Sequence, residues 1–258
     1  MKLENAFLQE ETKTIYPTDI FPNLVDALRK SPWYAYTIEH RKEKLATPTT
    51  PGYHYSSAEP HFNDGTGLGF WNGMYHLFYG YKPFRKSDEQ HYLWGHCISH
   101  DLIHWNDLPP AIHNGPEPET WTGSILVEEK RVIGVYRAWK AGTGDLGIGI
   151  AISEDPYLLN WHKMHGPNGD GLVIKCDPNI PAFHTGDPCI WKHQGKYYIL
   201  SGKVKYHPGS SQRMRQGYLF TSNDLENWEY IGPFIHDDMN SLFTDDLSCP
   251  TFWPIAEG

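Results

Sequence analysis

The chain has 258 residues and a formal net charge of −9, with aromatic residues making up 14% of it. The length suffices for one large domain or two small ones, and for a sizeable core. The acidic balance argues against a surface for nucleic acid or anionic membrane, because such surfaces need clustered Lys and Arg. Most of the rings are expected to pack between strands, but rings beside polar groups also suit a neutral ligand such as a carbohydrate.

Residues 1–52 differ from the rest and are predicted to form an N-terminal extension with short helices and a linker. Helix-compatible spacing between Asp26 and Lys44 is interrupted by Pro32, which lacks the N–H that a helix interior needs. The N-terminus shows no apolar signal-peptide core, and no run approaches the ~20 apolar residues of a membrane span. We therefore expect a cytoplasmic protein, or a secreted or periplasmic one if a leader was removed.

From Tyr53 onward, short runs rich in Tyr, Trp, Ile and Val alternate with Gly, Pro, Asn and Asp, which is typical of β-strands and turns. The stretch 60–79 (PHFNDGTGLGFWNGMYHLFY) is the most informative. It places a single carboxylate, Asp64, among turn-forming residues, and the turn after Trp71 joins two strands. This pattern predicts a carboxylate at the edge of a sheet, with rings such as Trp71 near enough to stack on a sugar.

A Ser-x-Asp segment followed by a Trp recurs three times, each time after a strand that begins with Gly. The three copies are 99–105, 153–161 and 222–228. In each copy the Asp suits a tight turn in which its carboxylate accepts backbone N–H groups. We therefore predict a structural role for Asp101, Asp155 and Asp224.

A second pattern recurs in phase with the first: 72–77 (NGMYHL) resembles 194–199 (QGKYYI), and both read as turns into a central strand. Four short strands in roughly 50 to 60 residues are typical of a β-propeller blade. Blades are predicted at about 60–112, 119–166 and 183–234, and another begins at 246–258. Site residues of successive blades would meet at one mouth of the central channel. Because closure needs ~4 to 8 blades, we expect further blades or another chain to complete the ring.

The four cysteines form no Cys-x-x-Cys pair, so a zinc site or a redox dithiol is not expected. Cys97, Cys189 and Cys249 lie in apolar runs and are predicted to be small buried hydrophobic residues. The His and carboxylate spacings do not call for a metal, and no cofactor is predicted.

The quoted motifs resemble those of glycoside hydrolase family 32, the invertase, levanase and fructosidase group, whose fold is a five-bladed propeller. The resemblance covers about residues 53–258 and is carried by HFNDGTG, SHDLIHWNDLPPAI, WTGS and GDPCIWKHQGKYYILSG, in that order. It implies an all-β fold, a β-propeller of the five-bladed glycosidase type, with about three full blades and the start of a fourth. It also implies hydrolysis of fructose-containing oligo- or polysaccharides by a retaining mechanism with two carboxylates.

The resemblance assigns roles to individual residues. Asp64 matches the nucleophile of an Asn-Asp pair, and Asp187 matches the aspartate of an Arg-Asp-Pro motif that stabilises the transition state. Residues 121–124 match a Trp-Ser-Gly-Ser stretch that contacts sugar, and Cys249 falls within a Glu-Cys-Pro motif. The side chains predicted to contact substrate are Asn63, Trp71, Trp121, Thr122, Ser124, His184 and Cys249.

The chain departs from the family pattern where Gly65-Thr66 replace Pro-Asn, where Gly186 replaces the arginine before Asp187, and where Ser248 replaces the acid/base glutamate. A serine hydroxyl cannot protonate a leaving alkoxide near neutral pH. Of the two nearest acids, Asp245 and Asp246, we predict Asp246 as the acid/base.

Two alternatives stay open. One is an inverting glycosidase for arabinan- or xylan-type glycans on the same fold, for which a carboxyl spacing of ~6.5 to 9.5 Å would be expected. The other is a non-catalytic carbohydrate-binding propeller, which the serine at position 248 favours.

Overall fold

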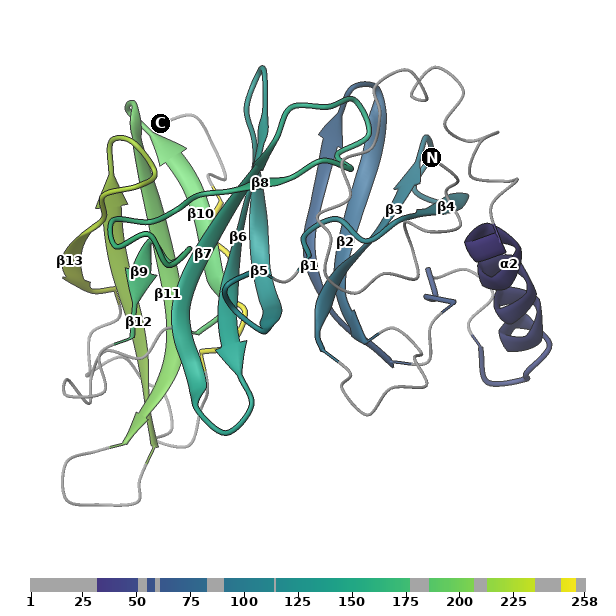
Figure 1. Cartoon of the computed structure of the whole chain (residues 1–258), viewed down its shortest axis with the longest axis horizontal. Coiled ribbons are helices and arrows are strands. Elements are labelled where there is room, and N and C mark those ends of the chain that lie inside the picture. The colour runs from purple at the N-terminus through teal and green to yellow at the C-terminus, as the bar shows by residue number, and fades with distance from the viewer. Residues whose placement is uncertain are drawn as a thin grey trace. The chain divides into compact units, whose positions relative to one another are not determined.

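The computed structural model describes residues 32–50, 55–58, 61–82, 91–113, 115–176, 186–206, 213–234 and 247–253. Over these ranges one helix precedes thirteen strands in three antiparallel sheets (Figure 1). The chain divides into two compact units. The first comprises Met1–His113, Glu129–Val132 and Ser153–Trp161, and the second comprises Asn114–Glu128, Ile133–Ile152 and His162–Gly258.

The first sheet has the order β1-β2-β3-β4. Its strands are β1 (His61–Trp71), β2 (Met74–Lys82), β3 (Leu93–Ser99) and β4 (Trp105–Leu108). The β1–β2 hairpin closes through Asn72 and Gly73, whose φ values of 48° and 81° are both positive. A two-residue turn with both φ values positive matches the twist of the flanking strands, and it confirms the turn expected from the sequence.

The helix α2 (Pro32–Leu45) is longer than the short helices expected from the sequence. Pro32 begins this helix and does not interrupt it, because the first turn has no intrahelical partner for the missing N–H. Arg41 forms an ion pair with Asp107 of β4 and donates to the carbonyl of Ser56. The Tyr55 hydroxyl donates to the same Asp107 carboxylate over 2.8 Å. These bonds tie the helix to the first sheet.

The second sheet contains β5 (Glu119–Val127), β6 (Val132–Lys140), β7 (Gly144–Ser153), β8 (His162–Lys163) and β9 (Ile174–Lys175). Both β8 and β9 pair with β7, so the outer strand of this sheet consists of two short pieces. The third sheet contains β10 (Pro188–His193), β11 (Lys196–Tyr206), β12 (Arg213–Ser222) and β13 (Glu229–Pro233). Its first hairpin turns at Gln194 and Gly195 with φ values of 48° and 81°.

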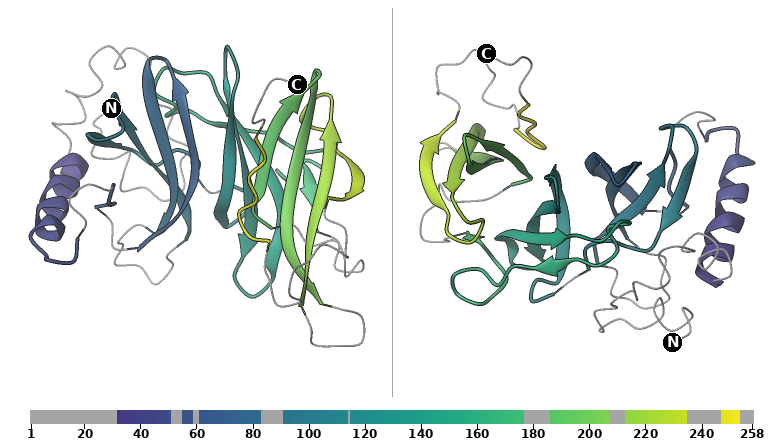
Figure 2. Two further views of the ribbon diagram at one scale, coloured as in Figure 1. Left: turned by 180° about the vertical axis from the view of Figure 1, so that it is seen from behind. Right: turned by 90° about the horizontal axis from the view of Figure 1, so that it is seen from above.

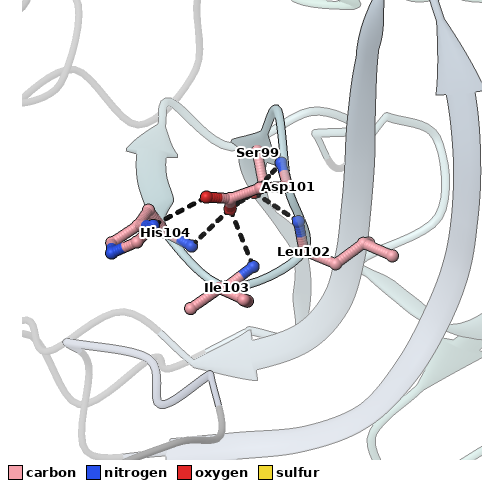
Figure 3. Close-up of polar contacts among 5 residues, drawn as sticks. All are labelled: Ser99, Asp101, Leu102, Ile103 and His104. Atoms are coloured by element: carbon pink, nitrogen blue, oxygen red, sulfur yellow. Dashed lines mark hydrogen bonds and ion pairs between the residues drawn. The ribbon is translucent and has the colours of Figure 1, made fainter.

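The repeated Ser-x-Asp segments form the predicted turns, and Figure 3 shows the first of them. Asp101 Oδ1 accepts the backbone N–H groups of Ile103 and His104 at 2.9 and 2.7 Å, and Ser99 Oγ accepts that of Leu102. The side-chain hydrogen bond from His104, together with the backbone donors, holds the pKa of Asp101 below its usual value. Equivalent bonds surround Asp155 and Asp224. Because backbone donors occupy these carboxylates, the structural reading of the three residues is confirmed.

Each unit has an apolar core. In the first unit a buried cluster comprises Tyr79, Tyr81, Leu93 and Cys97. In the second unit the core comprises Ile133, Val135, Ile148, Ile150, Val173, Ile174, Ile190, Tyr197, Ile199, Tyr218, Phe220 and Leu225. The sheets are open, and the number of blades and their boundaries stay predictions. No helix among the described residues is long and apolar enough to span a membrane, and the cellular location also stays a prediction.

Candidate active site

Asp64 lies in a β-bulge of β1. Phe62 pairs with Tyr81 and Gly65 pairs with Tyr79, so Asn63 and Asp64 together lie opposite the single residue between those partners. A bulge of this kind redirects a side chain and is frequent next to active sites. The Asp64 side chain is exposed, and that of Thr66, two residues on, is buried. In a regular strand the two would share a face. A second irregularity of the pairing lies between Gly65 and Gly67, so the different exposure of Asp64 and Thr66 follows from an irregular stretch of β1.

Trp71 lies at the opposite end of the same strand. Seven residues of extended chain separate it from Asp64, a span of roughly 20 Å. Its indole N–H donates to the carbonyl of Asp155 over 2.9 Å. The structure therefore does not bring Trp71 together with Asp64. The indole hydrogen bond of Trp71 instead supports the turn that follows β7.

Strand β5 carries the predicted sugar-contact stretch 121–124. A Cβ atom at Gly123 would lie 1.9 Å from the carbonyl oxygen of Val135 on β6, so glycine is required for the close approach of the two strands. Ser124 Oγ accepts the backbone N–H of Ile190 at 3.0 Å and links β5 to β10. Both residues thus have packing roles that can coexist with a role in binding.

The Trp121 ring is the centre of a polar and aromatic cluster. Its indole N–H donates to Glu119 Oε2 over 2.6 Å. The ring centroid lies 5.0 Å from that of Trp139 and 5.2 Å from the guanidinium carbon of Arg137. Thr122, the next residue of β5, is buried. A half-buried indole held from several sides is a rigid surface on which a sugar ring can stack.

Asp187 lies at the start of β10. The preceding Gly186 is anchored by Ser201, whose Oγ accepts the Gly186 N–H at 2.8 Å and also lies 3.2 Å from its carbonyl. Asp187 is buried, with 9% of its surface exposed. Its Oδ1 lies 3.6 Å from Arg137 Nη1, and its Oδ2 lies 3.5 Å from the Sγ atom of Cys249.

The expectation that Cys249 is buried is wrong. Cys249 is exposed and has a left-handed backbone, with φ at 49°. The segment 247–253 runs beside the third sheet (Figure 2), where the Leu247 carbonyl lies against Gly202 of β11. This path places the Cys249 thiol next to Asp187. Cys97 and Cys189 are buried, as expected.

Two predicted site residues, His184 and the proposed acid/base Asp246, lie outside the described residues, and so does Asp245. Ser248 is described and is exposed. Over the described ranges, no group of three or more His, Cys, Asp or Glu side chains is arranged to hold a metal ion.

Arg137 and its partner Asp145 were not predicted from the sequence as part of the site. The Nε atom of Arg137 donates to Asp145 Oδ1. The available signal was a lone arginine within the otherwise apolar run of β6 (VIGVYRAW), since a charge in a buried strand usually has a partner.

Comparison with known proteins identifies the relatives of this chain. Residues 54–258 match the family model described as the glycosyl hydrolases family 32 N-terminal domain. The chain is 27% identical to a sucrose-6-phosphate hydrolase from Klebsiella pneumoniae, over 85% of this chain and 46% of the relative. It is 30% identical to an insoluble beta-fructofuranosidase isoenzyme from Arabidopsis thaliana, over 83% of this chain and 36% of the relative.

A solved structure, the Bombyx mori GH32 beta-fructofuranosidase, matches with 25% identity and a TM-score of 0.59, over 80% of this chain and 43% of that chain. The chain therefore spans less than half the length of each of these three proteins.

Proposed function

Because the chain belongs to glycosyl hydrolase family 32, we propose that the protein releases fructosyl units from sucrose or fructan-type substrates with retention of configuration. The observation that carries the proposal is the position of Asp64. Asp64 is exposed in the irregular stretch of β1, within the Asn63-Asp64 pair that matches the family's nucleophile motif. Asp101, Asp155 and Asp224 accept backbone N–H groups of their own turns, which gives them a structural role. The named activities of the relatives support the substrate class.

In this proposal Asp64 attacks the anomeric carbon of the fructosyl unit and forms a covalent intermediate. A second carboxyl group ~5 to 5.5 Å away protonates the leaving oxygen and then activates water. Asp246 is proposed for this role. Asp187 accepts hydrogen bonds from ring hydroxyls, and these bonds strengthen as positive charge develops on the sugar. Asn63, Trp121, Thr122, Ser124, His184 and Cys249 are proposed to line the subsite.

We also propose that the three sheets are blades of a five-bladed propeller, which further blades or a second chain completes. Two features support this arrangement: the same order of four strand positions recurs in each sheet, and the chain spans less than half of its relatives.

A second candidate is a propeller that binds fructosyl sugars without cleaving them. The observation in its favour is Ser248, which stands exposed in the sequence position of the family's acid/base. A hydroxyl group there supplies no proton at neutral pH, so catalysis depends on another acid.

The test is product analysis of the full-length protein with sucrose, inulin, levan and arabino-oligosaccharides. We expect fructose from the first three and its loss in Asp64→Ala. Release of arabinose instead would support the inverting alternative. If no sugar is released but fructose raises the melting temperature of the wild type, the binding module is the correct reading. Hydrolysis undiminished in Asp64→Ala would contradict the assignment of the nucleophile.

A further inference from the structure

The geometry points to Arg137 as the residue that keeps Asp187 ionised and oriented, in place of the arginine that is missing at position 186. This inference rests on the proposed function, because it assigns a supporting residue to the proposed transition-state stabiliser. Arg137 is a positioning residue, since it acts on the sugar through Asp187.

Three contacts fix the Arg137 guanidinium. Its Nε atom donates to Asp145, and Nη1 lies 3.6 Å from Asp187 Oδ1. The guanidinium carbon lies 5.2 Å from the centroid of the Trp121 ring. A planar, always protonated group held by a carboxylate and an aromatic face loses little freedom and keeps its charge at every relevant pH.

Burial explains why Asp187 needs a cation. The Asp187 side chain is only 12% exposed, that of Arg137 is 20% exposed and that of Asp145 is 3% exposed. A carboxylate withdrawn from water favours its neutral form unless a positive charge is near. A neutral Asp187 would lose the negative charge that the oxocarbenium-like transition state requires.

The chain next to Asp187 cannot supply that charge. Gly186 has no side chain, and its N–H is engaged by Ser201 Oγ. On the other oxygen, Cys249 offers only a thiol at 3.5 Å, a weak donor. Arg137 instead reaches Asp187 from β6 of the second sheet, and Asp145 of β7 sets the direction in which its side chain extends.

The test needs variants in which no buried charged group loses its ion-pair partner. Replacing Arg137 alone would also take the guanidinium from the buried Asp145, and removing one partner of a buried ion pair is strongly destabilising. The series is therefore built on Asp145→Asn: D145N, D145N/R137M, D145N/D187N and the triple variant. The matched control is Asp107→Asn/Arg41→Met compared with Asp107→Asn, because Arg41 is a half-buried arginine whose aspartate partner on β4 has no proposed catalytic role.

The variants are expected to change both the midpoint of urea unfolding and the kinetics of hydrolysis. The midpoint of urea unfolding should fall more when R137M is added to D145N than when it is added to D145N/D187N, because only in the first step does a charged Asp187 lose the neighbouring guanidinium. In hydrolysis by the full-length protein, D145N/R137M should lose roughly a hundredfold in kcat relative to D145N, with a smaller change in KM. The acid limb of its pH profile of kcat should move toward neutral pH relative to D145N, while the acid limb of D107N/R41M stays where it is in D107N.

The two proposals can fail separately. Equal shifts of the unfolding midpoint in both steps, or an unmoved acid limb in an active D145N/R137M variant, would overturn the role of Arg137. If the wild type hydrolyses none of the fructosyl substrates, the proposed function fails. The unfolding series then still decides whether Arg137 supports Asp187.

Discussion

The two units hold their candidate carboxylates in different surroundings. Asp64 is exposed on a bulged edge strand of the first unit, whereas Asp187 in the second unit is buried beside Arg137 and Cys249. An exposed carboxylate is accessible to a reacting atom from solvent. A buried one is coupled to its neighbours, so its chemistry and the local structure change together. Substitutions in the two units should therefore give different combinations of lost activity and lost stability.

The largest effect is expected for Asp64→Ala. If Asp64 is the nucleophile, kcat of the full-length protein should fall at least about a thousandfold. The free energy of unfolding should change by no more than about 0.5 kcal/mol, as for other exposed sites. Initial rates with sucrose and urea unfolding of the same preparation measure both quantities. A large loss of stability would show that Asp64 belongs to the fold of the bulge.

Asp187→Asn is expected to lower kcat by roughly a hundred- to a thousandfold, the usual range for losing one electrostatic stabiliser. The fold should survive, because Arg137 keeps its pairing with Asp145. Steady-state kinetics with near-ultraviolet circular dichroism as a structural control would measure this. An effect on KM alone would mean that Asp187 contributes to ground-state binding only.

A third test concerns a buried pair in the first unit with no catalytic assignment. His76 Nδ1 and His96 Nε2 lie 2.9 Å apart, and both residues are fully buried. Burial lowers the pKa of His76 to about 4, and it lowers that of His96 well below its usual value. The unfolded chain therefore binds protons more readily than the folded one.

The two neutral imidazoles therefore contribute to the free energy of unfolding above pH 6.5. This contribution is lost as the pH falls from 6.5 toward 4, because protonation favours the unfolded chain. For His76 alone the loss between pH 7.5 and 5 is about 2 kcal/mol. Urea unfolding across this range should show the decline in the wild type and a weaker one in His76→Phe. His100→Gln, at an exposed position next to the same sheet, is the control and should leave the decline intact. An identical decline in His76→Phe would contradict the assignment.

The smallest effect is expected at a turn carboxylate. Asp155 accepts backbone N–H groups from Tyr157, Leu159 and Asn160. Asp155→Ala should cost about 1 to 2 kcal/mol of unfolding free energy, because those donors lose their partner. The kcat of the variant that remains folded should stay within about twofold of the wild type. A selective loss of kcat at full stability would mean that the turn shapes the site.

The sequence predicted the local features well, because their causes lie within a few residues. Asn72-Gly73 and Gln194-Gly195 take the positive φ values that their hairpins need, and the Ser-x-Asp turns form their own bonds. The predicted family is also confirmed by the match over residues 54–258.

The features that sequence reasoning missed depend on contacts between distant segments. The path of 247–253 along β11 decides that the Cys249 thiol faces Asp187 and not an apolar core. The partners of Arg137 come from other strands, so nothing within β6 itself reveals them. The bulge at Asn63 and Asp64 likewise exists only through the pairing of β1 with β2.

The most direct test of the central claim is to trap the covalent intermediate. A fructosyl donor with an activated leaving group needs no acid catalyst, so it reports on Asp64 independently of the acid/base. The full-length protein is mixed with β-fructofuranosyl fluoride, quenched in acid and mapped by peptide mass spectrometry. We predict a mass increase of one hexosyl residue on the peptide that contains Asp64, and none in Asp64→Ala. A hexosyl adduct on a different carboxylate, or rapid hydrolysis of the donor by Asp64→Ala, would contradict the account.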